Sequence, residues 1–184
     1  MLSRFKPAVT GLLKPVTVHL VRSGITPNHL TVVAVVLGLT SAYFIFAGKT
    51  IIGVFLLLIS SSLDALDGAL ARNENLRSEF GGFLDSVMDR YVDAAVIIAI
   101  GVHSGHVFLA SIAVVGALMV SYTRARAETI IERCDVGIAE RGERTLILIG
   151  GLVAGLEYYA LLVVAILAHF TAIHRVYYTH SQSR

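Results

Sequence analysis

The stretch that decides the fold is residues 64–93, which read DALDGALARNENLRSEFGGFLDSVMDRYVD. Long apolar runs flank it on both sides. The stretch contains five aspartates: Asp64, Asp67, Asp85, Asp89 and Asp93. One charged carboxylate in a membrane helix costs about 2.5–3.5 kcal/mol on insertion scales, so four together would cost on the order of 10 kcal/mol if nothing neutralised them. Bound divalent cations are therefore the first hypothesis for this stretch.

The spacing of the aspartates supports that hypothesis. The first two are three residues apart and the next two are four apart, and both spacings place a pair on one face of a helix. A polar stretch at 73–79 and the Gly81–Gly82 pair separate the two aspartate pairs, and this is typical of two antiparallel helices joined by a short loop. Folding this hairpin would bring both pairs together, and carboxylate oxygens suit magnesium, manganese or calcium.

A simpler interpretation is that these aspartates cap helices near a membrane surface. Capping residues occur at helix starts. Asp85, Asp89 and Asp93 instead recur every helical turn within a run that continues apolar to Gly101. The pattern therefore favours a metal site over caps.

The same residues also match a family pattern. Asp64-x-x-Asp67-Gly68-x-x-Ala71-Arg72, then Gly81 after eight residues, then Asp85 and Asp89 at intervals of four, resembles the complete signature of the CDP-alcohol phosphotransferases. Members of that family are integral membrane enzymes. The resemblance implies transfer of a phosphate-linked group from a CDP-linked donor to an alcohol, with release of CMP.

The resemblance also implies roles for individual residues. Two divalent cations, Mg²⁺ or Mn²⁺, are expected on Asp64, Asp67, Asp85 and Asp89, and Asp89 is also expected to take the proton from the acceptor hydroxyl. The CDP group is expected at Asp67, Gly68, Ala71, Arg72, Ser78 and Thr31. Asp93 lies outside the signature, and we expect it either to line the acceptor cavity or to pair with an arginine.

An arginine-rich stretch indicates the acceptor. Residues 121–144 read SYTRARAETIIERCDVGIAERGER, and a group of arginines beside a metal site would offer a phosphate several charge-assisted partners. The predicted phosphate-binding residues are Arg124, Arg126, Arg141, Arg144 and Arg175. The alternative is a positively charged cytoplasmic loop that only sets the membrane orientation. The stretch resembles the subgroup that makes phosphatidylinositol phosphate or archaetidylinositol phosphate, which implies inositol 1-phosphate as acceptor and CDP-archaeol or CDP-diacylglycerol as donor.

Other functions remain open at this point. Glycerol 3-phosphate also brings a phosphate to the arginines, and a CDP-inositol donor with an inositol phosphate acceptor would give a soluble product. Paired aspartates in membrane helices also occur in prenyltransferases and divalent-metal transporters. Such prenyltransferases are longer and lack the continuation Gly68-x-x-Ala71-Arg72, and a transporter would not need Gly68 and Ala71. Release of CMP that depends on a metal would separate the transferase from both.

Composition places the chain among polytopic membrane proteins. Its 184 residues are 55% hydrophobic, and the mean hydropathy is +0.75. We expect one all-α integral membrane domain over residues 1–184, with an interfacial amphipathic helix at 2–22 and a bundle of six membrane-spanning helices over 26–178. The expected spans are 26–47, 51–72, 80–103, 107–131, 143–156 and 158–178. The fifth is short, so we expect it to start earlier, near Gly137. We expect Thr26 to cap the first span, with Pro27 at its first helical position.

Positive charge predicts the orientation. Thirteen lysines and arginines fall on one side of this arrangement and only Lys49 on the other. The thirteen are Arg4, Lys6, Lys14, Arg22, Arg72, Arg77, Arg124, Arg126, Arg133, Arg141, Arg144, Arg175 and Arg184. We therefore expect a multi-pass protein of the cell membrane with both termini and the acidic site in the cytoplasm. A homodimer in contact with membrane lipid is expected, and no nucleic-acid partner.

Overall fold

The computed structural model describes residues 11, 13–74, 76 and 78–183. Over these residues the chain is all-helical, with seven helices. They are α2 (Lys14–Arg22), α3 (Pro27–Phe46), α4 (Thr50–Asn73), α5 (Glu79–His103), α6 (Val107–Ala127), α7 (Arg141–Ala154) and α8 (Glu157–Gln182). Residues 2–10 and 12 of the predicted 2–22 helix, with Arg4 and Lys6, lie outside the described residues, as do Arg77 and Arg184.

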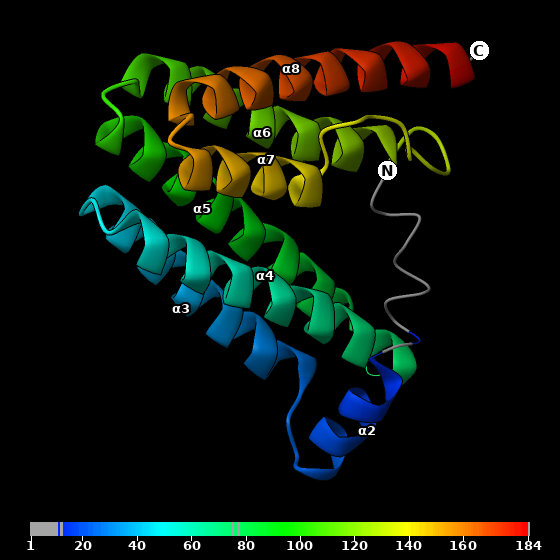
Figure 1. Ribbon diagram of the computed structural model, residues 1–184. Helices are drawn as coiled ribbons and strands as arrows, with labels where there is room; N and C mark the ends of the chain where they lie inside the picture. The colour runs from blue at the N-terminus through cyan, green and yellow to red at the C-terminus, as the bar shows by residue number, and fades with distance from the viewer. Residues whose placement is uncertain (1–10, 12, 75, 77, 184) are drawn as a thin grey trace. The chain divides into compact units, whose positions relative to one another are not determined.

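The chain divides into two compact units, residues 1–92 and 93–184, so the boundary falls within α5. In the first unit α3 and α4 pack side by side (Figure 1). Two buried serines join them, because the Ser41 hydroxyl donates to the Gly53 carbonyl and the Ser60 hydroxyl to the Ala34 carbonyl, both at 2.7 Å. Small polar residues at such contacts let two helices approach closely.

The N-terminus of α3 confirms the predicted cap. The Thr26 hydroxyl accepts from the His29 N–H at 3.4 Å, the His29 ring accepts from the Thr26 N–H at 3.3 Å, and Pro27 opens the helix. This reciprocal pair of bonds satisfies two backbone donors that have no partner within the helix.

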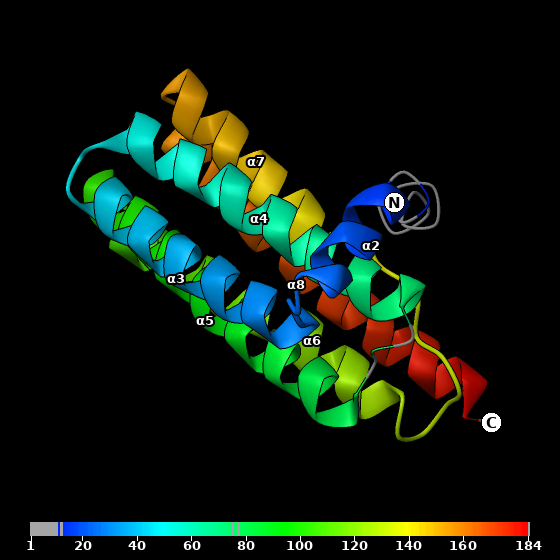
Figure 2. The same cartoon turned by 90° about the horizontal axis from the view of Figure 1, so that it is seen from below.

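Helix α2 lies against α4 (Figure 2). Its fully buried Thr17 is the point of contact, because its hydroxyl lies 3.1 Å from Glu74 Oε1 and accepts from the Asn73 side chain at 3.3 Å. The described part of the N-terminal segment is therefore fixed to the residues that follow the first aspartate pair.

In the second unit α8 packs against both α6 and α7 (Figure 1). The turn from α7 to α8 is tight. Gly155 adopts a left-handed conformation with φ +67° at the C-cap of α7, which glycine does at little cost. A methyl group on Gly151 would lie 2.3 Å from the Ala160 side chain, so the two helices meet at small residues.

The structure corrects two predicted boundaries. Helix α7 begins at Arg141, so the predicted earlier start near Gly137 is wrong: Gly137 has φ +123°, which no helix contains. Helix α6 ends at Ala127, four residues before the predicted Ile131. The missing residues belong to the irregular connection between α6 and α7.

Four of the described helices are long and apolar enough to cross a membrane: α3, α4, α6 and α8. Many of their large apolar side chains are exposed, as lipid-facing residues would be, for example Phe55, Phe108, Phe170 and Ile173. Helix α5 is long enough but has five charged residues among positions 79–93. Helix α7 has only 14 residues, about 21 Å at 1.5 Å per residue, which is shorter than the hydrocarbon core of about 30 Å.

Candidate active site

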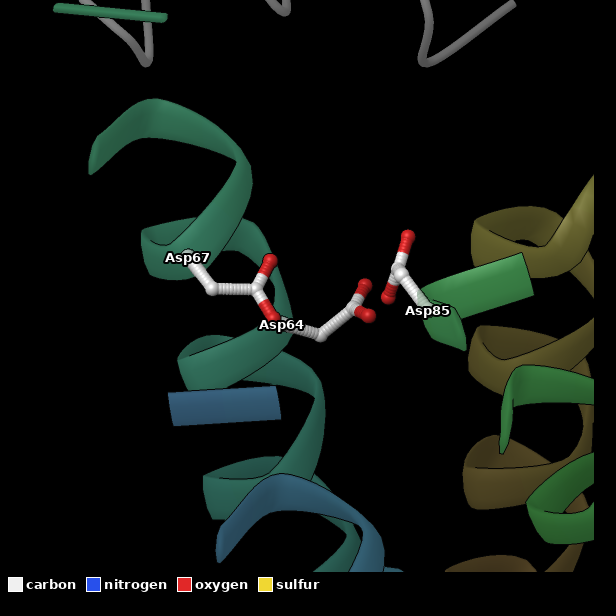
Figure 3. Close-up of side chains that lie close together, drawn as sticks. All are labelled: Asp64, Asp67 and Asp85. Carbon is white, nitrogen blue, oxygen red and sulfur yellow. The ribbon is translucent and has the colours of Figure 1, made fainter. Parts of the chain in front are cut away.

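Three of the predicted aspartates converge in the first unit. Asp64 and Asp67 come from the C-terminal half of α4 and Asp85 from the start of α5. One carboxylate oxygen of each lies within 4.8 Å of the others, and the three side chains point toward one another (Figure 3). The helical spacing and the hairpin, predicted from the sequence, produce this convergence.

The donor set of this cluster fits a hard divalent cation. Asp67 is buried, and Asp64 and Asp85 are half-buried, so three like charges approach one another away from bulk water. Mutual repulsion in such surroundings is costly unless a cation neutralises it. Carboxylate oxygens from two helices are ligands that Mg²⁺ and Mn²⁺ accept.

Helix α3 adds a residue to the cluster. The hydroxyl of buried Thr31 donates a 2.7 Å hydrogen bond to Asp67 Oδ2. A hydrogen bond from a neighbouring helix fixes the orientation of a metal-binding carboxylate. Thr31 was expected at the CDP group, and in the structure it bonds to Asp67.

Asp89 lies one helical turn after Asp85 on α5 and is half-buried. It does not belong to the group of three oxygens within 4.8 Å among the described residues. Its expected double role as metal ligand and general base stays a prediction.

The other residues expected at the CDP group lie on either side of the loop between α4 and α5. A methyl group on Gly68 would lie 3.1 Å from Arg72 Nη1, so the guanidinium of Arg72 extends over Gly68 on the same helix face, with half-buried Ala71 beside it. Ser78 precedes α5, and its hydroxyl accepts from the Gly81 N–H at 3.0 Å. Ser78 therefore caps α5, and Gly81 has to stay small because a methyl there would lie 2.7 Å from the Ser78 hydroxyl.

In the second unit Arg124 faces three carboxylates. Its guanidinium lies 3.0 Å from Glu128, 2.9 Å from Asp135 and 3.5 Å from Glu140, and its side chain is 39% exposed. Arg126, two residues on, is exposed. The two arginines thus diverge on α6, as their spacing predicts.

Arg141 and Arg144, at the start of α7, both pair with the carboxylate of Asp93 on α5. Arg141 Nε lies 3.3 Å from Asp93 Oδ1, and Arg144 Nη2 bonds to Asp93 Oδ2. The side chain of Arg144 is 4% exposed, and that of Arg141 is 22% exposed. Of the two roles expected for Asp93, the structure confirms pairing with an arginine, and it shows two such pairs.

A further group of bonds fixes the segment 134–140, which precedes α7. Arg175, 2% exposed, donates from Nε to the Val136 carbonyl at 2.8 Å and from Nη1 to the Val120 carbonyl at 2.5 Å. The Thr171 hydroxyl accepts from the Ile138 and Ala139 N–H groups at 3.3 and 3.2 Å. Helix α8 thereby satisfies the backbone of a segment without secondary structure.

Thr171 and the acidic partners of Arg124 were not among the residues predicted from the sequence. A signal was present for Thr171, because it lies four residues before Arg175 and so on the same face of α8. No local signal identified the partners of Arg124, since Asp135 and Glu140 lie in an irregular segment whose path depends on α8.

Comparison with protein families matches residues 24–177 to the family described as CDP-alcohol phosphatidyltransferase. The archaetidylinositol phosphate synthase of Pyrococcus horikoshii is 40% identical over 182 residues, which cover 96% of this chain and 95% of that protein. The phosphatidylinositol phosphate synthase of Cutibacterium acnes is 32% identical over 155 residues, 80% of this chain and 75% of that protein.

This chain is also similar to solved structures of an enzyme of the same name as one of these relatives. The phosphatidylinositol phosphate synthase of Mycobacterium tuberculosis with CDP-DAG bound is 28% identical, with a TM-score of 0.79 over 90% of this chain and 92% of that one. A structure of the same enzyme in complex with manganese and citrate has a TM-score of 0.80 at 27% identity, over 90% of this chain and 88% of that one.

Proposed function

Because this chain belongs to the CDP-alcohol phosphatidyltransferase family, we propose that it transfers the phosphate-linked lipid of a CDP-lipid to inositol 1-phosphate and releases CMP. The observation behind this proposal is the cluster of Asp64, Asp67 and Asp85 within the family signature. The relatives named for inositol phosphate lipids support the choice of acceptor, and the relative solved with CDP-DAG supports a CDP-lipid donor. The donor is CDP-archaeol or CDP-diacylglycerol.

The aspartates would hold two divalent cations, Mg²⁺ or Mn²⁺. When bound, such ions neutralise the pyrophosphate and stabilise the oxygens that attack and leave. Asp64, Asp67, Asp85 and Asp89 would be the ligands, and Thr31 would keep Asp67 in the binding orientation. The manganese in the solved relative supports the binding of a divalent cation.

The transfer itself needs one proton acceptor. The acceptor hydroxyl oxygen attacks the phosphorus that bears the lipid, its proton passes to the Asp89 carboxylate, and the bond from that phosphorus to the CMP oxygen breaks. Gly68 and Ala71 would leave room for the cytidine beside α4. Arg72 would contact the donor phosphates, with Asp67, Ser78 and Thr31 completing the binding site for CDP.

Three of the arginines expected at the acceptor can be reached from solvent. Arg124, Arg126 and Arg141 are exposed or partly exposed, so we assign them to the acceptor phosphate. Arg144 and Arg175 are buried and donate to backbone carbonyls of Ala139, Val120 and Val136. For these two we propose that they hold the segment 134–140 and the start of α7, and so shape the acceptor site.

In the membrane we propose a single domain of six spanning helices, in which α5 and α7 join the four helices that are long and apolar enough. Helix α2 would lie at the interface, and both termini and the active site would face the cytoplasm. The protein would act as a homodimer.

CMP release from the purified protein in detergent tests the function. CDP-archaeol and CDP-diacylglycerol would each be offered with inositol 1-phosphate, glycerol 3-phosphate, serine or free inositol, with and without Mg²⁺ or Mn²⁺. The Asp89→Asn variant serves as the control for background release. Metal-dependent CMP release with inositol 1-phosphate alone supports the proposal. Release only with glycerol 3-phosphate keeps the chemistry and changes the acceptor, and no release with any pair rejects the transferase.

A further inference from the structure

Asp93 is a largely buried carboxylate that the aspartate signature does not include. Its two oxygens bond to two different arginines of α7, Oδ1 to Arg141 Nε at 3.3 Å and Oδ2 to Arg144 Nη2. Its side chain is 14% exposed. Asp93 therefore pairs with both arginines at the start of α7, a turn that also contains Glu143.

The two arginines have different surroundings. Arg144 is 4% exposed, and it also donates from Nη1 to the Ala139 carbonyl at 2.7 Å, so it is held between α5 and the segment that precedes α7. Arg141 is 22% exposed, and Asp93 contacts its Nε, the nitrogen nearest the stem. A contact at Nε fixes the plane of a guanidinium and thus the direction of its two terminal nitrogens.

Loss of the Asp93 charge would affect both arginines. Residues three apart share a face, so the two guanidiniums repel each other unless a carboxylate lies between them. Arg144 would keep a buried charge without its carboxylate, a change that is strongly destabilising in buried ion pairs. Relief requires the first turn of α7 to move, and Arg141 moves with it.

We propose that Asp93 is a positioning residue for the acceptor phosphate: it fixes Arg141, directly through Nε and indirectly through Arg144, in the orientation that meets the phosphate. This inference rests on the proposed function, in which Arg141 binds the acceptor. It assigns Asp93 no contact with substrate and no proton transfer.

The test compares Michaelis constants for the two substrates. In Asp93→Asn we expect the KM for inositol 1-phosphate to rise about tenfold, as when a residue that orients a binding group is lost. The KM for the CDP-lipid should stay within about twofold of the unmodified protein, because the metal cluster is untouched. Asp93→Glu, which keeps the charge, should restore part of the affinity. Glu132→Gln removes one exposed carboxylate from the α6–α7 connection and is the matched control, with both constants unchanged.

A second pair of variants tests whether Asp93 acts through Arg141. If Asp93→Asn fails to fold, Asp93→Glu replaces it, alone and in the double variant. Arg141→Lys leaves the Arg144 bond to Asp93 in place but removes the Nε contact, so it should raise the acceptor KM as Asp93→Asn does. In the double variant Asp93→Asn/Arg141→Lys the acceptor KM should be no higher than in Arg141→Lys alone.

Three results would overturn the inference: an acceptor KM that is unchanged or lower in Asp93→Asn, an equal rise in both Michaelis constants, or additive effects in the double variant. Failure of the proposed function gives a different result, because the unmodified protein would then release no CMP with inositol 1-phosphate. If it uses glycerol 3-phosphate instead, the same comparison is made with that acceptor.

Discussion

At the scale of single residues, the aspartate cluster makes the sharpest prediction. Replacement of Asp67 by Asn removes the charge of a buried carboxylate that lies within 4.8 Å of two others. We expect CMP release to fall at least about a hundredfold, since loss of a ligand group impairs both metal binding and charge stabilisation. The measurement is CMP release across a titration of Mg²⁺ and of Mn²⁺.

The matched control for Asp67→Asn is Ser62→Ala on the same helix. Ser62 is exposed, and its hydroxyl donates to the Leu58 carbonyl of its own helix at 2.7 Å. Its loss should leave the metal dependence unchanged. Activity of Asp67→Asn equal to that of Ser62→Ala would rule out a metal role for this cluster.

Thr31 provides a milder change at the same cluster. Thr31→Val keeps the shape of the side chain and removes the 2.7 Å hydrogen bond to Asp67 Oδ2. The concentration of Mg²⁺ that gives half-maximal activity should rise about tenfold, because Asp67 loses the group that orients it. Thr40→Val on α3 is the control and should show no shift, because the Thr40 hydroxyl donates to the Val36 carbonyl of its own helix at 2.7 Å. An equal shift in both variants would contradict the orienting role.

The sequence predicted the aspartate cluster because its geometry is local. Two residues three apart on one helix and a short loop to the next helix are enough to bring Asp64, Asp67 and Asp85 together. The partners of the arginines were not predictable in this way. Asp93 and Arg144 are 51 residues apart, and Asp93 could equally have faced a cavity until the position of α7 was known.

At the scale of elements, the irregular segment before α7 depends on a glycine. Gly137 has φ +123°, and a methyl group there would lie 2.3 Å from Thr171 Cγ2. Gly137→Ala should therefore destabilise the folded protein by about 1–3 kcal/mol through backbone strain alone. The measurement is thermal unfolding in detergent, followed by the acceptor KM, which should rise because the segment leads into Arg141.

Gly150→Ala is the matched control for this segment. Gly150 lies within α7, and a methyl group there meets nothing within 4 Å, so alanine should raise helix stability by up to about 1 kcal/mol. Opposite signs for the two glycines are expected. A destabilisation of the same size at both positions would show that the strain at Gly137 is not the cause.

Element boundaries were predictable where capping and turn residues mark them. Thr26 and Pro27 identified the start of α3, and the predicted spans agree with α4, α5 and α8 within a few residues. The start of α7 was placed too early because the sequence from Gly137 gives no strong stop signal. The segment before α7 is irregular because it bonds to Thr171 and Arg175 on α8, which lie more than 30 residues later in the chain.

At the scale of the whole molecule, the distribution of charge predicts how the chain crosses the membrane. Lys49, in the turn between α3 and α4, is the one basic residue on its predicted side, and the exposed Ser183, near the C-terminus, is predicted on the opposite, cytoplasmic side. With six spans, a cysteine placed at either position must react with a membrane-impermeant thiol reagent, and the two cysteines must react from opposite sides of the cell membrane.

The chain is suited to this measurement because its single cysteine, Cys134, is fully buried and should give little background. In intact cells Lys49→Cys should be labelled from outside, whereas Ser183→Cys should be labelled only after the cells are opened. The unmodified protein, with Cys134 alone, is the control. Labelling of both variants from the same side would mean an odd number of spans between the two positions has been assigned wrongly. Because α7 is too short to cross the bilayer unaided and α5 bears the aspartates, one of these two helices, but not both, would then have to be reassigned.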